Sequence, residues 1–137
     1  MELRIFLLAD FANLDAGHKL NIIGAFNTIQ ARIFPAVHPS MYLVAKVAAE
    51  LGEFGTQRDY KIIFFDEDAN ELGKIEGRFS FPQPKDRQRR SEFNVVIALR
   101  DLQFSKEGRY EFRLLVNDTL LGVVPLDVVE RSELPQE

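Results

Sequence analysis

Apolar and polar side chains alternate with a period of two along most of this chain. Successive residues of a β-strand point to opposite faces of a sheet, so this period predicts strands that each bury one face. The clearest example has four apolar residues at every second position, namely Phe93, Val95, Ile97 and Leu99. No segment has the sustained i, i+3, i+4, i+7 stripe of an amphipathic helix. We therefore expect an all-β protein.

Turn-forming residues at short intervals divide the chain into eight predicted strands. Asn and Asp bond to their own backbone at turns and Gly adopts positive φ, and clusters of these residues separate the apolar runs. The stretch 42–51 holds three alanines that favour helix, but Val44, Val47 and Pro39 favour the strand that we adopt. The predicted strands are one that ends before Asn13 and those at residues 19–26, 41–49, 57–65, 72–81, 93–100, 109–116 and 120–128.

Eight short antiparallel strands have to cover their apolar faces with one another. An antiparallel β-sandwich of immunoglobulin-like or jelly-roll type does so, and a closed β-barrel is the alternative. A chain of 137 residues has the size of one domain, which we assign to residues 1–129. Residues 130–137 carry Pro135, three glutamates and little apolar content, so we expect a frayed tail there.

The composition excludes several classes of function. The chain has no cysteine, which rules out disulfides, thiol catalysis and thiolate metal sites. Its net charge of −4 argues against nucleic acid as a partner. The N-terminal apolar run, residues 5–9, is shorter than a secretory signal requires, and no stretch approaches the roughly 18 apolar residues of a membrane span. We therefore expect a cytoplasmic protein that does not contact a membrane.

Three segments carry a resemblance to a known family. They read FLLADFAN at residues 6–13, KLNIIGAF at 19–26 and FPAVHP at 34–39. They resemble a family of small bacterial proteins of unknown function. This resemblance implies a bacterial cytoplasmic protein with one β-domain, and it brings no activity, cofactor, partner or functional residue with it. Separately, residues 108–123 are similar to the last hairpin of many bacterial sandwich domains, a pattern that specifies architecture alone.

One of the two histidines, His38, lies close to a serine in the sequence. A serine-type hydrolase needs a base within hydrogen-bond reach of its nucleophile, and an extended segment would put His38 and Ser40 on one face. No Gly-x-Ser-x-Gly motif accompanies them, and Pro35 and Pro39 predict a rigid loop. We therefore favour a structural role for His38, with a small-ligand or hydrolytic site in the 34–40 loop as an alternative.

Asp66, Asp68 and Asn70 have the spacing of the oxygen ligands that open a calcium loop. The sixth position of such a loop should be glycine and is Glu71, and the twelfth should be glutamate and is Gly77. We therefore predict a solvated hairpin turn here, and neither a metal site nor another cofactor.

Positive charge is concentrated at residues 85–90, where four basic residues accompany one acidic residue. The preceding Pro82 and Pro84 predict an exposed loop. Guanidinium groups bind phosphates well, so Arg87, Arg89 and Arg90 are candidates for binding an anion or a nucleic acid. A single basic loop on an acidic protein, without interleaved aromatic residues, favours a solubilising role instead.

An excess of apolar surface points to a contact between proteins. In the first predicted strand, one face holds Leu3, Ile5, Leu7 and Ala9, and the other holds Phe6 and Leu8. A sandwich buries one face of each strand, so the second face needs a partner, a loop that covers it or a ligand. We expect a non-enzymatic interaction module, or a structural subunit of a bacterial assembly, that forms a homodimer through its N-terminal half. The first strand is the first candidate for the contact, and replacing Phe6 or Leu8 by Glu tests whether either side chain lies in it or in the interior.

Overall fold

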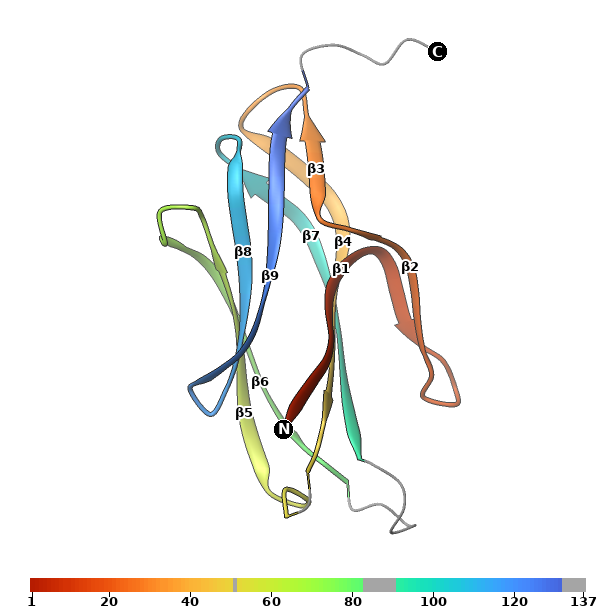
Figure 1. Ribbon diagram of the computed structural model, residues 1–137. Helices are drawn as coiled ribbons and strands as arrows, with labels where there is room; N and C mark the ends of the chain where they lie inside the picture. Colours follow the sequence, from red (N-terminus) through yellow and green to blue (C-terminus); the bar gives the residue numbers. More distant parts are fainter. Residues whose placement is uncertain (51, 83–90, 132–137) are drawn as a thin grey trace.

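The structure of the protein, a computed structural model, describes residues 1–50, 52–82 and 91–131 (Figure 1). These residues form nine β-strands, and no helix that could cross a membrane occurs among them. The strands are β1 (Glu2–Leu14), β2 (Leu20–Phe26), β3 (Thr28–Ala31), β4 (Ala36–Ala48), β5 (Gln57–Phe65), β6 (Glu71–Ser80), β7 (Glu92–Phe104), β8 (Gly108–Val116) and β9 (Thr119–Glu130).

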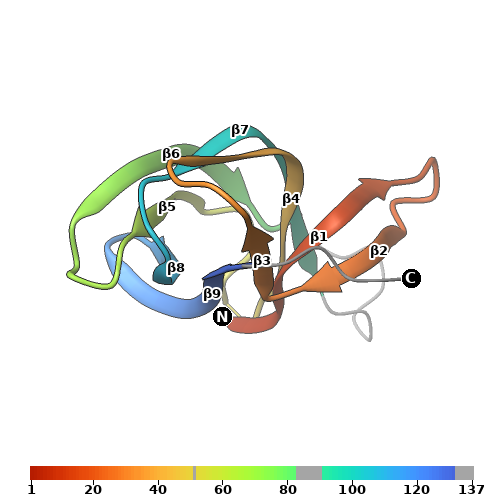
Figure 2. The same ribbon diagram turned by 90° about the horizontal axis from the view of Figure 1, so that it is seen from above.

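The strands form two sheets that pack face to face. One sheet has the order β2-β1-β4-β7 and the other has the order β3-β9-β8-β5-β6. Figure 2 shows the two layers from above. Neighbouring strands are antiparallel except β3 and β9, which are parallel. Neither sheet closes on itself. The predicted β-sandwich is therefore confirmed, and the closed barrel is not the fold.

Aromatic side chains fill much of the space between the sheets. The ring of Phe64 stacks on Phe112 with the ring centroids 4.7 Å apart, and its centroid lies 6.0 Å from that of Phe104 in an edge-on contact. Val95, Tyr110 and Phe112 are buried, as the sequence predicts. The other three residues predicted for the core are half-buried against the same cluster: Phe93, Ile97 and Leu99. The predicted core face is therefore correct.

The strand count needs a correction, because β3 is absent from the eight predicted strands. It runs from Thr28 to Ala31 and pairs in parallel with the last residues of β9. Of its four residues only Ile29 is buried. A single inward side chain does not make an alternating pattern, and for this reason the sequence did not reveal the strand.

The loop predicted at residues 34–40 is wrong for most of its length, because β4 begins at Ala36. Pro39 has no N–H to donate to a sheet. In the register of β4 with β7 it faces Asp101, a residue with a positive φ of 52°. The two strands remain paired on both sides of this position, so the sheet continues through the proline.

The faces of the first strand also differ from the prediction. The register of β1 against β4 shifts between Leu3 and Ile5, which marks a β-bulge. Leu3 therefore lies with Phe6 and Leu8 on the core side, where Leu8 is fully buried. Phe6 and Leu8 pack into this protein's own core, so they are not contact residues. The second apolar face of β1 begins with Ile5 and Leu7.

One side of the sandwich is closed, because β1 lies against β9 there. Gly122 on β9 makes this close approach possible. A Cβ atom added to Gly122 would overlap the side chain of Leu3. The opposite side lies between β6 and β7, which are the outermost strands of the two sheets.

Candidate functional site

His38 and Ser40 have separate partners in β4. The His38 ring lies 5.9 Å from the ring of Phe26, between their centroids, and pairs in register with Leu102. The Ser40 hydroxyl accepts a hydrogen bond of 2.9 Å from the guanidinium group of Arg100. Among the described residues, no hydrogen bond joins His38 to Ser40. The half-buried imidazole therefore has an aromatic neighbour and not the arrangement of a general base beside its nucleophile.

The basic residues Arg87, Arg89 and Arg90 lie outside the described residues. The residues on either side of this segment are joined by a hydrogen bond. Ser91 is buried, and its hydroxyl donates a hydrogen bond of 2.7 Å to the carbonyl oxygen of Pro82.

The carboxylate of Asp66 accepts hydrogen bonds from the backbone of its own turn. The N–H groups of Asp68 and Asn70 each donate to Asp66 Oδ1 at 2.9 Å. The side-chain amide of Asn70 donates to Oδ2, and this bond above all lowers the pKa of Asp66 below its ordinary value of 3.8. In the described part of the chain, no group of three or more His, Asp and Glu residues is placed to hold a metal ion. The geometry is that of a hairpin turn stabilised by its own aspartate.

Glu53 anchors the N-terminal amine. The amine of Met1 lies 2.7 Å from Glu53 Oε1, and Arg58 Nη2 lies 3.7 Å from Oε2. Burial raises the pKa of Glu53, but hydrogen bonds from the amine and from the Glu50 N–H, with the charges of the amine and Arg58, outweigh it. The pKa therefore lies below the ordinary value of 4.5. This cluster fastens the start of β1 to the turn before β5.

The outer face of the four-stranded sheet is apolar. In register across β1, β4 and β7 lie Leu7, Val44 and Val96. Two residues further along β4, on the same face, the rings of Tyr42 and Phe11 make an edge-to-face contact with the centroids 5.2 Å apart. The second sheet lies on the opposite side of these strands (Figure 2). This outer face is the second apolar face that the first strand predicts.

The hairpin of β1 and β2 projects from the sandwich as an arm, which we define as residues 10–25 (Figures 1 and 2). β1 pairs with β4 only as far as Ala9, and beyond it pairs with β2 alone. Both faces of the arm carry exposed apolar side chains: on one face Phe11 and Ile23 lie opposite each other, and on the other face the exposed Leu14 lies opposite the half-buried Leu20. Ile23 is 62% exposed. Among the described residues, no strand pairs with the outer edge of β2, which ends its sheet.

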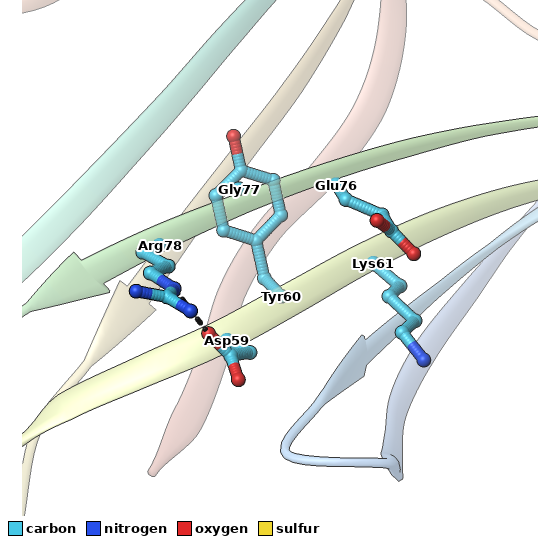
Figure 3. Close-up of a pocket in the computed structure, with 6 residues that line it drawn as sticks. All are labelled: Asp59, Tyr60, Lys61, Glu76, Gly77 and Arg78. Atoms are coloured by element: carbon cyan, nitrogen blue, oxygen red, sulfur yellow. Dashed lines mark hydrogen bonds and ion pairs between the residues drawn. The ribbon is translucent and has the colours of Figure 1, made fainter.

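A polar hollow of about 290 Å³ lies across β5 and β6 (Figure 3). Its charged side chains form ion pairs: Arg78 Nε lies 3.0 Å from Asp59 Oδ1, and Lys61 Nζ lies 3.2 Å from Asp118 Oδ1. The Tyr60 ring lies over the backbone of Gly77, where an added Cβ would be 2.5 Å from the ring. The first ion pair joins β6 to β5, and the second joins β5 to the turn between β8 and β9, both at an exposed surface.

A second cavity, of about 260 Å³, lies at the open side of the sandwich between β6 and β7. Most of its lining is apolar and comes from both sheets. The lining residues are Ile62, Phe64, Leu72, Gly73, Lys74, Ile75, Leu99, Leu102, Gln103 and Phe112. Sequence reasoning missed this cavity, because its residues come from four strands, β5 to β8, that meet only when the two sheets pack together.

The fold and these surfaces define a two-sheet β-sandwich protein with an apolar outer sheet face, a projecting arm and an apolar lateral cavity. A family model matches residues 4–129, and the chain belongs to the family of unknown function DUF6941. This match confirms the resemblance to a family of unknown function. No curated protein matches the chain.

Proposed function

We propose that this protein is a non-enzymatic interaction module whose arm binds a second copy of the same chain. The observation that carries the proposal is the arm itself, which exposes apolar side chains on both faces and an unpaired strand edge. Large apolar side chains that gather on a projecting element are typical of a protein interface. We propose the bacterial cytoplasm as the location of this activity, as the resemblance in the sequence implies.

The sequence of β2 supports a second copy as the partner. When two identical strands pair antiparallel across a two-fold axis, residues near the axis meet their own copies. Like charges directly opposite each other destabilise such a pair. β2 reads LNIIGAF and contains no charged residue, so self-pairing brings no like charges together. It also lacks the lysine and proline that commonly protect an exposed edge.

Pairing through β2 has a defined structural result. The four-stranded sheet of one copy and that of its partner would become one sheet of eight strands, joined at the two β2 edges. Ile23 and Phe11 of each copy would lie on the same face of that sheet, next to the apolar surface around Tyr42. Backbone hydrogen bonds would supply the register, and the exposed side chains would supply the burial of apolar area.

The absence of cysteine makes this arrangement directly testable. We would replace Asn21, Ile22 and Ile23 by Cys one at a time, so that each variant carries a single thiol. Residues that face each other on an antiparallel pair have Cα atoms about 4.5–5.5 Å apart, which a disulfide can span. Mild oxidation should therefore link the chains efficiently at the position nearest the axis.

Thr28→Cys is the matched control, because Thr28 is exposed on β3, the outermost strand of the other sheet. This variant should remain unlinked under the same oxidation. Failure of all three β2 variants to cross-link in a protein that sediments as a dimer would place the contact elsewhere. If the variants do not cross-link and the protein sediments as a monomer, the protein does not self-associate.

Two alternatives have less support. A hydrolytic or ligand site at residues 34–40 gains nothing from the separate partners of His38 and Ser40. Anion or nucleic-acid binding by Arg87, Arg89 and Arg90 concerns residues outside the described part of the chain, and it stays a prediction from the sequence.

A further inference from the structure

The open side of the sandwich admits small molecules to the core. β6 and β7 are the outermost strands of their sheets, and no β-pairing between them closes this side. The cavity of about 260 Å³ lies between them. It reaches Phe64 and Phe112, the stacked pair at the centre of the core, so its inner end is apolar.

A glycine opens this cavity. Two glycines of β6, Gly73 and Gly77, lie at positions two residues either side of Ile75, which packs against the core. At Gly77 the Tyr60 ring fills the space that a side chain would occupy (Figure 3). At Gly73 nothing lies within 4 Å of an added Cβ atom. The missing side chain therefore leaves an empty volume beside Phe64, with which Gly73 pairs in register.

The polar groups of the cavity are hydrogen-bond donors at its rim. Lys74 and Gln103 are both exposed, and they come from the two strands that border the opening. The ammonium group of Lys74 lies 3.2 Å from Glu76 Oε1 and retains further N–H donors. A lysine and a glutamine that border an apolar cavity favour a ligand with an apolar body and an anionic end, which would compete with Glu76 for the Lys74 ammonium group.

We propose that the lateral cavity binds the hydrocarbon chain of a small carboxylate, with the carboxylate at Lys74 and Gln103. The cavity of about 260 Å³ is large enough for a short hydrocarbon chain such as that of an eight-carbon carboxylate, since each methylene group occupies roughly the volume of a water molecule, about 30 Å³. The hydrocarbon chain of the ligand lies along Leu99, Leu102 and Ile75 and displaces water from their apolar surface. This site is independent of the arm, which lies at the other end of the four-stranded sheet.

The test is an NMR titration of the protein, labelled at its methyl groups, with n-octanoate as the probe. Octanoate should shift the methyl signals of Ile75, Leu99 and Leu102 in a saturable manner. The signal of Ile23, in the arm, should not move. Acetate, which has the carboxylate without the chain, should produce no saturable shift.

Gly73→Val is the decisive variant, because the valine side chain fills the space that the hydrocarbon chain of the ligand needs. Displacing about three methylene groups of the ligand should weaken binding about fiftyfold. Ser80→Val places the same side chain at an exposed position of the same strand, outside the cavity, and should bind octanoate like the original protein. Gly73→Ala should lie between the two and serves as the second variant if Gly73→Val does not fold.

Three results would overturn the proposal. If octanoate causes no saturable shift of the methyl signals of the lining residues, the cavity is only a packing gap. Unchanged octanoate affinity in Gly73→Val would place the chain elsewhere. Binding of n-octanol as tight as that of octanoate would remove the assignment of Lys74 and Gln103 to the carboxylate.

Discussion

Replacing Phe112 by Ala tests how the core depends on its stacked aromatic pair. Phe112 is 2% exposed, and its ring lies on Phe64 with the centroids 4.7 Å apart. A buried Phe→Ala change costs about 3–5 kcal/mol, from lost transfer free energy and from the void left behind. One side of Phe112 already borders the lateral cavity, so fewer contacts are lost. We therefore expect a loss near 3 kcal/mol, the lower end of the range.

Phe104→Ala is the matched comparison. Phe104 is fully buried, contacts the rings of Phe64 and Tyr110, and does not line that cavity. Its loss should approach about 5 kcal/mol. Urea unfolding measures both values, with an unchanged m-value as evidence that each variant unfolds from the same compact state. A cost below about 1 kcal/mol for Phe112→Ala, as for a surface substitution, would refute the packing argument. Equal costs would refute the role given to the cavity.

Three further outcomes follow from individual contacts. Gly122→Val should destabilise the protein by about 1–3 kcal/mol in urea unfolding, because the added side chain overlaps Leu3 where β1 meets β9; a neutral change would contradict the close approach. The pKa of Glu53 is lowered in the folded protein, so its contribution to stability is full above pH 4.5 and is lost as the pH falls through the lower folded value. Glu53→Gln should flatten the fall of the melting temperature on acidification, and an unchanged slope would count against the anchor. Calcium should leave the melting temperature unchanged, because Asn70 and the turn backbone already bond to Asp66; a calcium-dependent rise that Asp66→Asn abolishes would reveal a site.

The alternation of apolar residues predicted the sandwich and most of its strands, because a buried face imposes its period on the sequence. The same rule misplaced Leu3, since a β-bulge inserts a residue and moves the preceding side chain to the other face. It also missed β3, where only one of four residues points inward. Pro39 read as part of a loop, although a sheet tolerates a proline where its position needs no donor.

The candidate sites were predictable only in part. The two apolar faces of β1 are visible in the sequence, and they predicted a contact in the N-terminal half, which stays a prediction. The sequence did not reveal that the hairpin leaves the sandwich, because alternation carries no information on where a sheet ends. The lateral cavity depends on what lies beside Gly73, and this neighbourhood exists only after two sheets have packed.

Sedimentation velocity of the protein and of Ile23→Glu tests the central claim, which is self-association through the β2 edge. At a protein concentration of tens of micromolar, the original chain should sediment as a dimer with twice the monomer mass of 15.7 kDa. Ile23→Glu should sediment as a folded monomer, because two copies would place like charges near the axis. Thr28→Glu puts the same charge at the edge of the other sheet and should remain a dimer. Circular dichroism of each variant verifies the fold. A 15.7 kDa monomer for the original chain, or a dimer that Ile23→Glu leaves intact, would contradict the account.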